Sequence, residues 1–184
     1  LSNTRYASQS GTSVERDFVE APSQMYEEWA RRKETLSTLA DFCQPACPRV
    51  DDALIAKLKD VHNYGRGLKY ARQTLYAQYD MAIHTADALQ TQPLETWQKL
   101  EGKTALGYTP TTEFPGQFGH IMGGYQVGYY GYMWSEVIAL DMLSAFGHNL
   151  NNPEVGERYR KTILSQGGQK KAKQLVVDFL GREP

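Results

Sequence analysis

Apolar residues recur every three or four positions along most of the chain, which is the spacing of one face of an α-helix. The longest such pattern runs from Leu68 to about Leu89. Its apolar stripe contains Leu68, Ala71, Leu75, Tyr79 and Ala82. The alternation of apolar and polar residues that marks a half-buried strand is sustained nowhere in the sequence. The pattern therefore predicts an all-α fold.

Turn-forming and helix-capping residues divide the rest of the chain into further predicted helices. Thr12 or Ser13 caps the first, and Pro22 is expected to kink or restart it before it continues to about residue 39. The remaining helices are expected over about 50–61, 92–100, 127–146, 153–164 and 169–180. In the helix over 127–146, the residues expected to crowd the interior are Trp134, Val137, Ile138, Leu140, Met142 and Leu143. Residues 101–125 form a long irregular stretch, which in a compact domain is often functional.

Composition and charge narrow the class of protein. The chain has 184 residues, 41% hydrophobic and 22% charged, which suits one globular domain or a large part of one. Its 20 basic and 21 acidic residues leave a net charge of -1, which gives no electrostatic reason to expect nucleic acid or an anionic membrane. No stretch approaches the roughly 20 apolar residues of a membrane span. We therefore expect no nucleic-acid partner and no membrane contact.

The two cysteines, Cys43 and Cys47, fall in a proline turn expected over 43–50. No further cysteine exists to complete a four-thiolate zinc site. Two reduced thiols are the favoured interpretation, and a local disulfide is the alternative. Reduced thiols fit a cytoplasmic location, which is the one we expect.

The segment from Gly119 to Trp134 combines glycines with polar aromatic residues and leads directly into a hydrophobic helix. Its polar rings are His120, Tyr125, Tyr129, Tyr130 and Tyr132. Each buried hydroxyl needs a hydrogen-bond partner, so a purely structural core has little use for so many. A mobile loop that closes over a substrate and donates hydrogen bonds to it would use this composition. A glycine-kinked start of a helix with interfacial tyrosines fits equally well from the residues alone.

A second group of polar residues lies near the start of the chain. Asp17 and Glu20 are three residues apart, so on a helix they share a face, beside the apolar Val14 and Phe18. Carboxylates next to an apolar stripe are costly unless they are paired or bind a metal. The residues alone favour a solvated acidic edge balanced by Arg16.

Three motifs favour the functional interpretation of both groups, because they resemble motifs of the thimet oligopeptidase family in order and spacing. The first is Glu15-Arg-Asp-Phe-Val-Glu-Ala-Pro-Ser-Gln24, with Trp29 following, which looks like the segment downstream of that family's zinc motif. The second is the glycine–tyrosine segment, which is similar to the family's mobile active-site loop, with Met133 where Leu is common. The third is the tail, with matches at 152–160, 167–168 and 178–184. The resemblance spans essentially the whole chain.

The resemblance implies a zincin-type oligopeptidase with a helical lower lobe below a deep channel. In that family a His-Glu-x-x-His helix supplies two zinc histidines and the general base, and a later glutamate is the third ligand. Glu20 falls on that third position, and we place Asp17 as the acceptor of a hydrogen bond from a ligand histidine. By the same resemblance, His120 and Tyr132 are catalytic groups that face the oxyanion and the substrate backbone. The substrate-binding residues are His120, Tyr125, Tyr129 and Tyr132.

One departure from the family pattern is that His-Glu-x-x-His is absent from this sequence. The histidines are His62, His84, His120 and His148, and none is paired at helical spacing. For all but His120 we expect structural or solvent-exposed roles. The chain then corresponds to a C-terminal part of the catalytic region. Its expected segments are the exit of the zinc helix and a loop over 1–12, helices with the third zinc ligand over 13–100, the substrate loop over 101–131, and C-terminal helices over 132–184.

We expect the chain to be a portion of a zinc-dependent oligoendopeptidase, which hydrolyses short peptides with a metal-activated water. The full-length enzyme binds one Zn²⁺, and its partners are short peptides and, for this chain, the missing N-terminal part of the same enzyme. The isolated chain is expected neither to retain the zinc nor to cleave peptides. The alternative is a non-catalytic helical interaction or scaffold module derived from this family. Single-stranded nucleic-acid binding through the glycine–tyrosine segment is disfavoured, because residues 104–157 contain no Lys or Arg.

Overall fold

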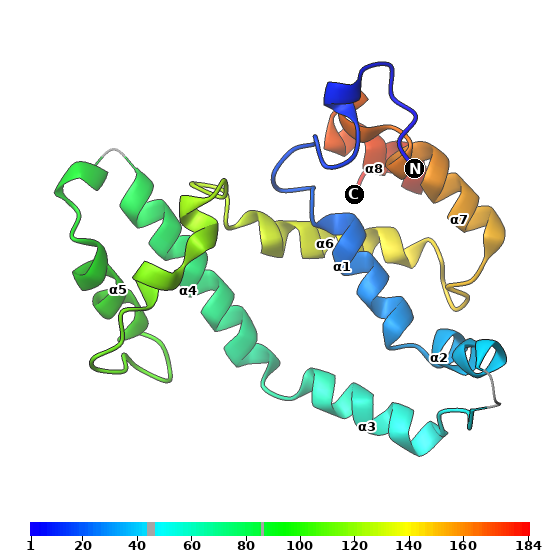
Figure 1. Ribbon diagram of the computed structural model, residues 1–184, viewed down its shortest axis with the longest axis horizontal. Helices are drawn as coiled ribbons and strands as arrows, with labels where there is room; N and C mark the ends of the chain where they lie inside the picture. The colour runs from blue at the N-terminus through cyan, green and yellow to red at the C-terminus, as the bar shows by residue number, and fades with distance from the viewer. Residues whose placement is uncertain (44–46, 86) are drawn as a thin grey trace. The chain divides into compact units, whose positions relative to one another are not determined.

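The computed structural model describes residues 1–43, 47–85 and 87–184. Helices and turns make up the described residues, with no strand among them, which confirms the all-α prediction. The chain forms two compact units (Figure 1). Unit 1 contains Leu1–Tyr64 and Trp134–Pro184, and unit 2 contains Gly65–Met133.

Unit 1 is built from the two ends of the chain. Its helices before unit 2 are η1 (Ala7–Gln9), α1 (Ala21–Tyr26), η2 (Glu27–Ala30), α2 (Lys33–Leu39), η3 (Ala40–Phe42) and α3 (Asp52–Asn63). Those after it are most of α6 (Gly131–Ser144), then α7 (Pro153–Tyr159), the π-helical turn η7 (Arg160–Leu164), η8 (Gly167–Gln169) and α8 (Ala172–Leu180). At two helices, α3 and α7, a capping side chain marks the start. Asp51 accepts a hydrogen bond from Leu54 N at 2.7 Å, and Asn152 accepts one from Glu154 N at 3.0 Å.

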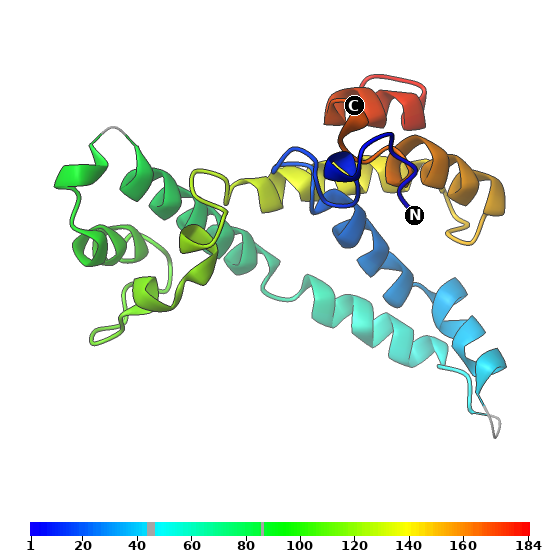
Figure 2. The same ribbon diagram turned by 45° about the horizontal axis from the view of Figure 1, so that its top comes forward.

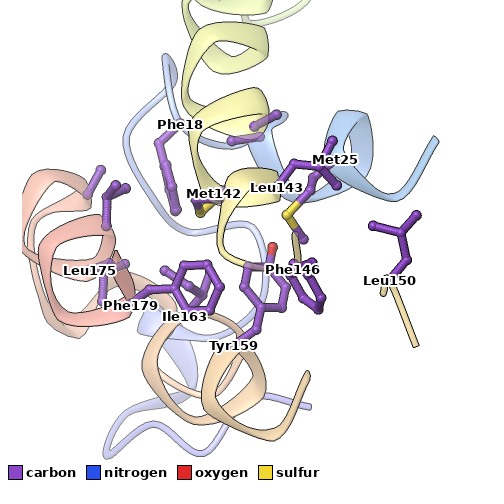
Figure 3. Packing of buried hydrophobic residues seen from close by; sticks show 14 residues of the cluster. Phe18, Met25, Met142, Leu143, Phe146, Leu150, Tyr159, Ile163, Leu175 and Phe179 are labelled. Carbon is purple, nitrogen blue, oxygen red and sulfur yellow. The ribbon is translucent and has the colours of Figure 1, made fainter. Parts of the chain in front are cut away.

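The core of unit 1 joins α1, α6, α7 and α8 (Figure 3). Aromatic rings from separate segments meet edge to face, with centroids 5.1 Å apart for Trp29 and Phe146 and 5.2 Å apart for Tyr159 and Phe179. The buried residues of this core are Phe18, Ala21, Met25, Ala139, Met142, Leu143, Phe146, Leu150, Tyr159, Ile163, Ala172, Leu175, Val176 and Phe179.

Only one face of α6 enters this core. Met142 and Leu143 are buried as predicted, but Trp134 is 55% exposed, Val137 60% and Leu140 47%. The prediction that all these residues crowd the interior was therefore wrong for Trp134, Val137 and Leu140. Period alone could not divide them, because apolar residues are spread around the helix rather than along one face.

The first residues of the chain pack against the turn before α8. Asn3 N donates to Ser165 O at 2.8 Å. At η8 the backbones approach so closely that a Cβ added to Gly168 would lie 2.1 Å from Ser13 O. A Cβ on Gly167 would lie 2.1 Å from Gln9 O. Two glycines are therefore needed here because there is no room for a side chain.

The helix predicted from residue 13 is replaced by turns over 16–20, so that regular helix begins only at α1. Long-range contacts explain the difference. The Glu15 carboxylate accepts a hydrogen bond from Ala172 N, at the start of α8, at 2.9 Å. Ser135 Oγ donates to Asp17 O at 2.8 Å. Both interactions tie this segment to distant residues rather than to the next helical turn.

The cysteines follow the alternative interpretation. Cys43 and Cys47 are joined as a disulfide, with Cα atoms 5.6 Å apart, so the favoured prediction of reduced thiols was wrong. The cysteines therefore give no support to a cytoplasmic location, which stays a prediction. Pro45, part of the predicted proline turn, lies outside the described residues. In the part of the chain that the structure describes, no helix has the length and apolarity needed to cross a membrane.

Unit 2 is organised along one long helix. It contains α4 (Arg66–His84), η4 (Ala88–Gln90), α5 (Pro93–Glu101), η5 (Phe114–Gln117), η6 (Gly119–Met122) and the first turn of α6. Helix α5 packs beside α4 (Figures 1 and 2). The buried core consists of Leu75, Tyr79, Trp97, Phe118, Ile121 and Tyr129. The irregular stretch after α5 thus packs on α4 through its aromatic residues.

Two predicted boundaries shift in unit 2. The long helix expected to reach Leu89 ends at His84, and the helix expected from about Val127 begins at Gly131. Between η6 and α6 the backbone makes consecutive turns, with Tyr125 N bonded to His120 O at 3.1 Å and Gly128 N to Tyr125 O at 2.9 Å. Residues 123–130 are therefore compact turns, and the glycine–tyrosine segment becomes α-helical only at Gly131.

Candidate functional site

The loop from Gly119 to Tyr132 owes its shape to a few backbone positions. Gly124 has φ 120°, a conformation that residues with a Cβ rarely adopt. A Cβ on Gly123 would lie 3.0 Å from Gly119 O, so the loop also closes tightly on itself. Val127 has φ 59° although it is β-branched, which costs on the order of 1–2 kcal/mol. Such strain persists only where surrounding contacts impose it.

These turns bring all four predicted loop residues together. The His120 ring centroid lies 5.9 Å from each of the centroids of Tyr125, Tyr129 and Tyr132. Tyr125 and Tyr132 are stacked, with centroids 5.0 Å apart and an interplanar angle of 18°. The structure thus forms one cluster, the loop cluster, that offers an imidazole and several phenol hydroxyls.

The members of the loop cluster differ in exposure. His120 is exposed, and Tyr125 and Tyr132 are half-buried. Tyr129 is only 8% exposed, and its hydroxyl donates to Gln73 Oε1 on α4 at 3.3 Å. Burial raises the pKa of Tyr129, and the nearby Tyr76 adds to this, so its phenol stays protonated at neutral pH. Tyr129 is therefore a hydrogen-bond donor already engaged by α4.

The loop is also bound by a buried carboxylate that the sequence analysis did not single out. Asp80 on α4 is 1% exposed. Its Oδ1 accepts a hydrogen bond from Val127 N and its Oδ2 one from Tyr129 N, each at 3.0 Å. His84 Nδ1 donates to Oδ1 at 2.9 Å. The available signal was a carboxylate directly after the apolar Tyr79, with a histidine one helical turn later.

Unit 2 also contains a cavity of about 400 Å³, lined by Arg72, Glu101, Phe114, Gln117 and threonines of the segment between α5 and η5. Arg72 forms an ion pair with the buried Glu101 and lies over the ring of Trp97, 5.2 Å from its centroid. None of the residues predicted for the site lines this cavity.

Asp17 and Glu20 lie in unit 1, in the turns that precede α1. Asp17 lies within these turns, and Glu20 is their last residue. Glu20 is the N-terminal flanking residue of α1, and Ser23 Oγ donates to its Oε2 at 3.2 Å and to its carbonyl at 3.0 Å. The buried Phe18 and Ala21 anchor the chain on either side. Asp17 is fixed through its carbonyl by Ser135. The two carboxylates are half-buried but do not share a helical face.

Zinc sites take three or four ligands, of which a catalytic site takes three from protein. No group of three or more His, Cys, Asp or Glu side chains among the described residues is arranged to hold a metal ion. Glu20 offers suitable chemistry for one ligand, and these residues do not make up a zinc site by themselves.

Comparison with known proteins shows which class of protein this chain resembles. Saccharolysin from Saccharomyces cerevisiae is 37% identical over 94% of this chain and 25% of its own length. A thimet-like oligopeptidase from Dictyostelium discoideum is 33% identical over 97% of the chain and 27% of its own length. Oligopeptidase A from Salmonella typhimurium is 34% identical over the whole chain and 28% of its own length. The class is that of peptide-hydrolysing enzymes.

Residues 1–184 all match the profile of peptidase family M3. The chain belongs to peptidase family M3, which confirms the resemblance found in its three motifs. It spans about a quarter of the length of the curated relatives that it matches.

Proposed function

We propose that this chain supplies the substrate-binding loop and one zinc-ligating carboxylate of a zinc-dependent oligoendopeptidase that acts on short peptides. The loop cluster carries the proposal, because one exposed imidazole and two stacked, half-buried tyrosines gather in a loop of a peptidase-family chain. The peptides and the remainder of the enzyme, which would bring the other zinc ligands, are the proposed partners.

In this proposal the loop cluster binds the peptide and stabilises developing charge. His120 and Tyr132 donate hydrogen bonds to the tetrahedral oxyanion and the substrate backbone, and Tyr125 donates to a neighbouring carbonyl. Stacking holds Tyr125 and Tyr132 in fixed orientations before substrate arrives, so little reorganisation is needed. Tyr129 would join them by exchanging Gln73 for a substrate carbonyl.

Glu20 is proposed as the carboxylate ligand of one catalytic Zn²⁺, with Asp17 accepting a hydrogen bond from a ligand histidine. Zinc in such a site acidifies a bound water and polarises the scissile carbonyl. Phe18 and Ala21, buried on either side, restrict where the Glu20 backbone can lie. The bond from Ser23 Oγ to Glu20 Oε2 fixes one rotamer of the carboxylate.

The 184-residue chain alone is proposed to be inactive. Its sequence contains no His-Glu-x-x-His, so it brings neither the two zinc histidines nor the general base that the family uses. A non-catalytic helical scaffold is the competing function, and it predicts that changes at Glu20 and in the loop cluster leave the activity of the complete gene product unchanged.

The proposal is tested by zinc content and by hydrolysis of a quenched fluorescent peptide. The complete gene product should bind about one zinc and cleave, and the 184-residue chain should do neither. Glu20→Gln should lose zinc and activity together. Its matched control is Glu34→Gln, which removes an exposed carboxylate of α2 and should change neither property.

Tyr132→Phe separates substrate contacts from metal binding. It should retain zinc and lose roughly 10²–10³-fold in kcat, the usual effect of removing one oxyanion donor. The 91% exposed Tyr64 provides the control Tyr64→Phe, which should keep full activity. Peptide cleavage by the 184-residue chain, or full zinc in Glu20→Gln, would refute the ligand assignment. A folded complete gene product that cleaves nothing would favour the scaffold.

A further inference from the structure

We infer that Asp80 is a positioning residue that holds the loop cluster in register with α4. The inference rests on the proposed function, in which that loop contacts substrate. Asp80 itself is buried and reaches no substrate, so it would act only through the backbone that it binds.

Both carboxylate oxygens of Asp80 are used. Oδ1 accepts from Val127 N at 3.0 Å and from His84 Nδ1 at 2.9 Å, and Oδ2 accepts from Tyr129 N at 3.0 Å. A carboxylate buried to this extent is costly unless hydrogen bonds replace its water. Three such bonds to a charged acceptor are among the stronger interactions in proteins. The loop backbone thus replaces the solvent of the Asp80 carboxylate.

The positions of the two bound amides explain why these hydrogen bonds to Asp80 would affect the orientation of the tyrosine rings. Val127 and Tyr129 lie between Tyr125 and Tyr132 in the chain, so fixing their amides fixes the turn that brings these two rings into a stack. The left-handed conformation of Val127 shows that the turn is imposed rather than locally preferred. Val127 is 44% exposed, so its own side chain provides little packing to impose it.

Helix α4 holds Tyr129 at two points. Asp80 binds its amide and Gln73 its hydroxyl, and the two α4 residues are seven positions apart, which is two helical turns along the same face. His84, one turn beyond Asp80, completes the set through bonds to the Asp80 carboxylate and carbonyl. One face of α4 therefore acts as the rigid support for the loop cluster.

The test compares Asp80→Asn with Asp60→Asn in the complete gene product. The asparagine side chain keeps the shape of the aspartate but has only one acceptor oxygen for two amides, whereas Asp60 is an exposed carboxylate on α3. In Asp80→Asn, amide hydrogen exchange across residues 124–131 should accelerate about 10-fold or more, the loss expected for one bond to a charged group. The kcat should fall by at least about 10-fold with zinc content unchanged. Asp60→Asn should match the wild type in all three.

A second substitution separates positioning from general loss of folding. Glycine adopts positive φ without strain, so Val127→Gly should recover part of the kcat lost in Asp80→Asn. In the wild-type background, Val127→Gly should lower kcat by less than Asp80→Asn does. Unchanged exchange over residues 124–131 in Asp80→Asn would overturn the inference, as would purely additive effects of the two substitutions. The exchange measurement needs no activity. It therefore tests whether Asp80 holds the loop even if peptide cleavage, and with it the proposed function, fails.

Discussion

The contact between Gly168 and the start of the chain allows a quantitative test of unit 1. Substitution to alanine would place a Cβ 2.1 Å from Ser13 O, whereas real Cβ contacts are essentially never below 3.0 Å. Both partners are backbone, so neither can rotate away, and the two segments must separate by roughly 1 Å. Gly168 itself has φ -87°, so alanine adds no conformational strain and the clash acts alone.

The expected cost of Gly168→Ala follows from overpacking. Forcing extra volume into a packed site costs about 1–3 kcal/mol, and two rigid backbones put this case near the upper end, at about 3 kcal/mol. For a chain of this size that lowers Tm by roughly 6–12 °C. The control is Gly156→Ala within α7, where a Cβ meets nothing within 4 Å and removal of a helical glycine should stabilise by about 0.5–1 kcal/mol.

The assay is urea unfolding of the 184-residue chain and the two variants, followed by circular dichroism at 222 nm. The free energy of unfolding should fall for Gly168→Ala and rise for Gly156→Ala, with unchanged m-values. Two variants of equal stability would show that the first residues do not lie against η8. The packing described for the residues before the Glu20 turn would then be wrong.

Two further measurements probe unit 1. Ser135→Ala removes the fully buried hydroxyl that donates to Asp17 O, and it should destabilise by about 1–3 kcal/mol; a neutral effect would show that this bond does not hold the turn. Hydrogen bonds from Arg160 and Lys161 lower the pKa of Glu157 to about 2, so its small contribution to stability is complete above the ordinary value of 4.5 and disappears as pH falls toward 2. Carbon-13 titration should show this midpoint, and Arg160→Gln should raise it; a midpoint already near 4.5 would contradict the ion pair.

Sequence reasoning succeeded where structure depends on nearby residues. Asp51 and Asn152 cap the helices expected after them, because a capping side chain and its amide are only two or three residues apart. For the glycine–tyrosine segment the composition left a mobile loop and a glycine-kinked helix start open, and the structure brings its four predicted rings together.

It failed where the determining partner is distant. The apolar spacing of Val14 and Phe18 suggested a helix, but the Glu15 carboxylate binds an amide 157 residues away. The role of Asp80 depends on amides 47 and 49 residues away, and no local pattern specifies that pairing. The family resemblance predicted Glu20 as a zinc ligand, and among the described residues no group of three or more His, Cys, Asp or Glu side chains could hold a metal ion.

The bond between Glu15 and Ala172 also has a consequence for the order of events during synthesis. The Glu15 carboxylate, in the turn that carries Glu20, is synthesised before its anchor, which lies 157 residues later in the chain. At about 5–20 residues per second, that anchor follows after roughly 10–30 s. Until then, this turn lacks the hydrogen bond that Ala172 N donates to Glu15. The turn before α1 therefore cannot reach its final position until the start of α8 has been made.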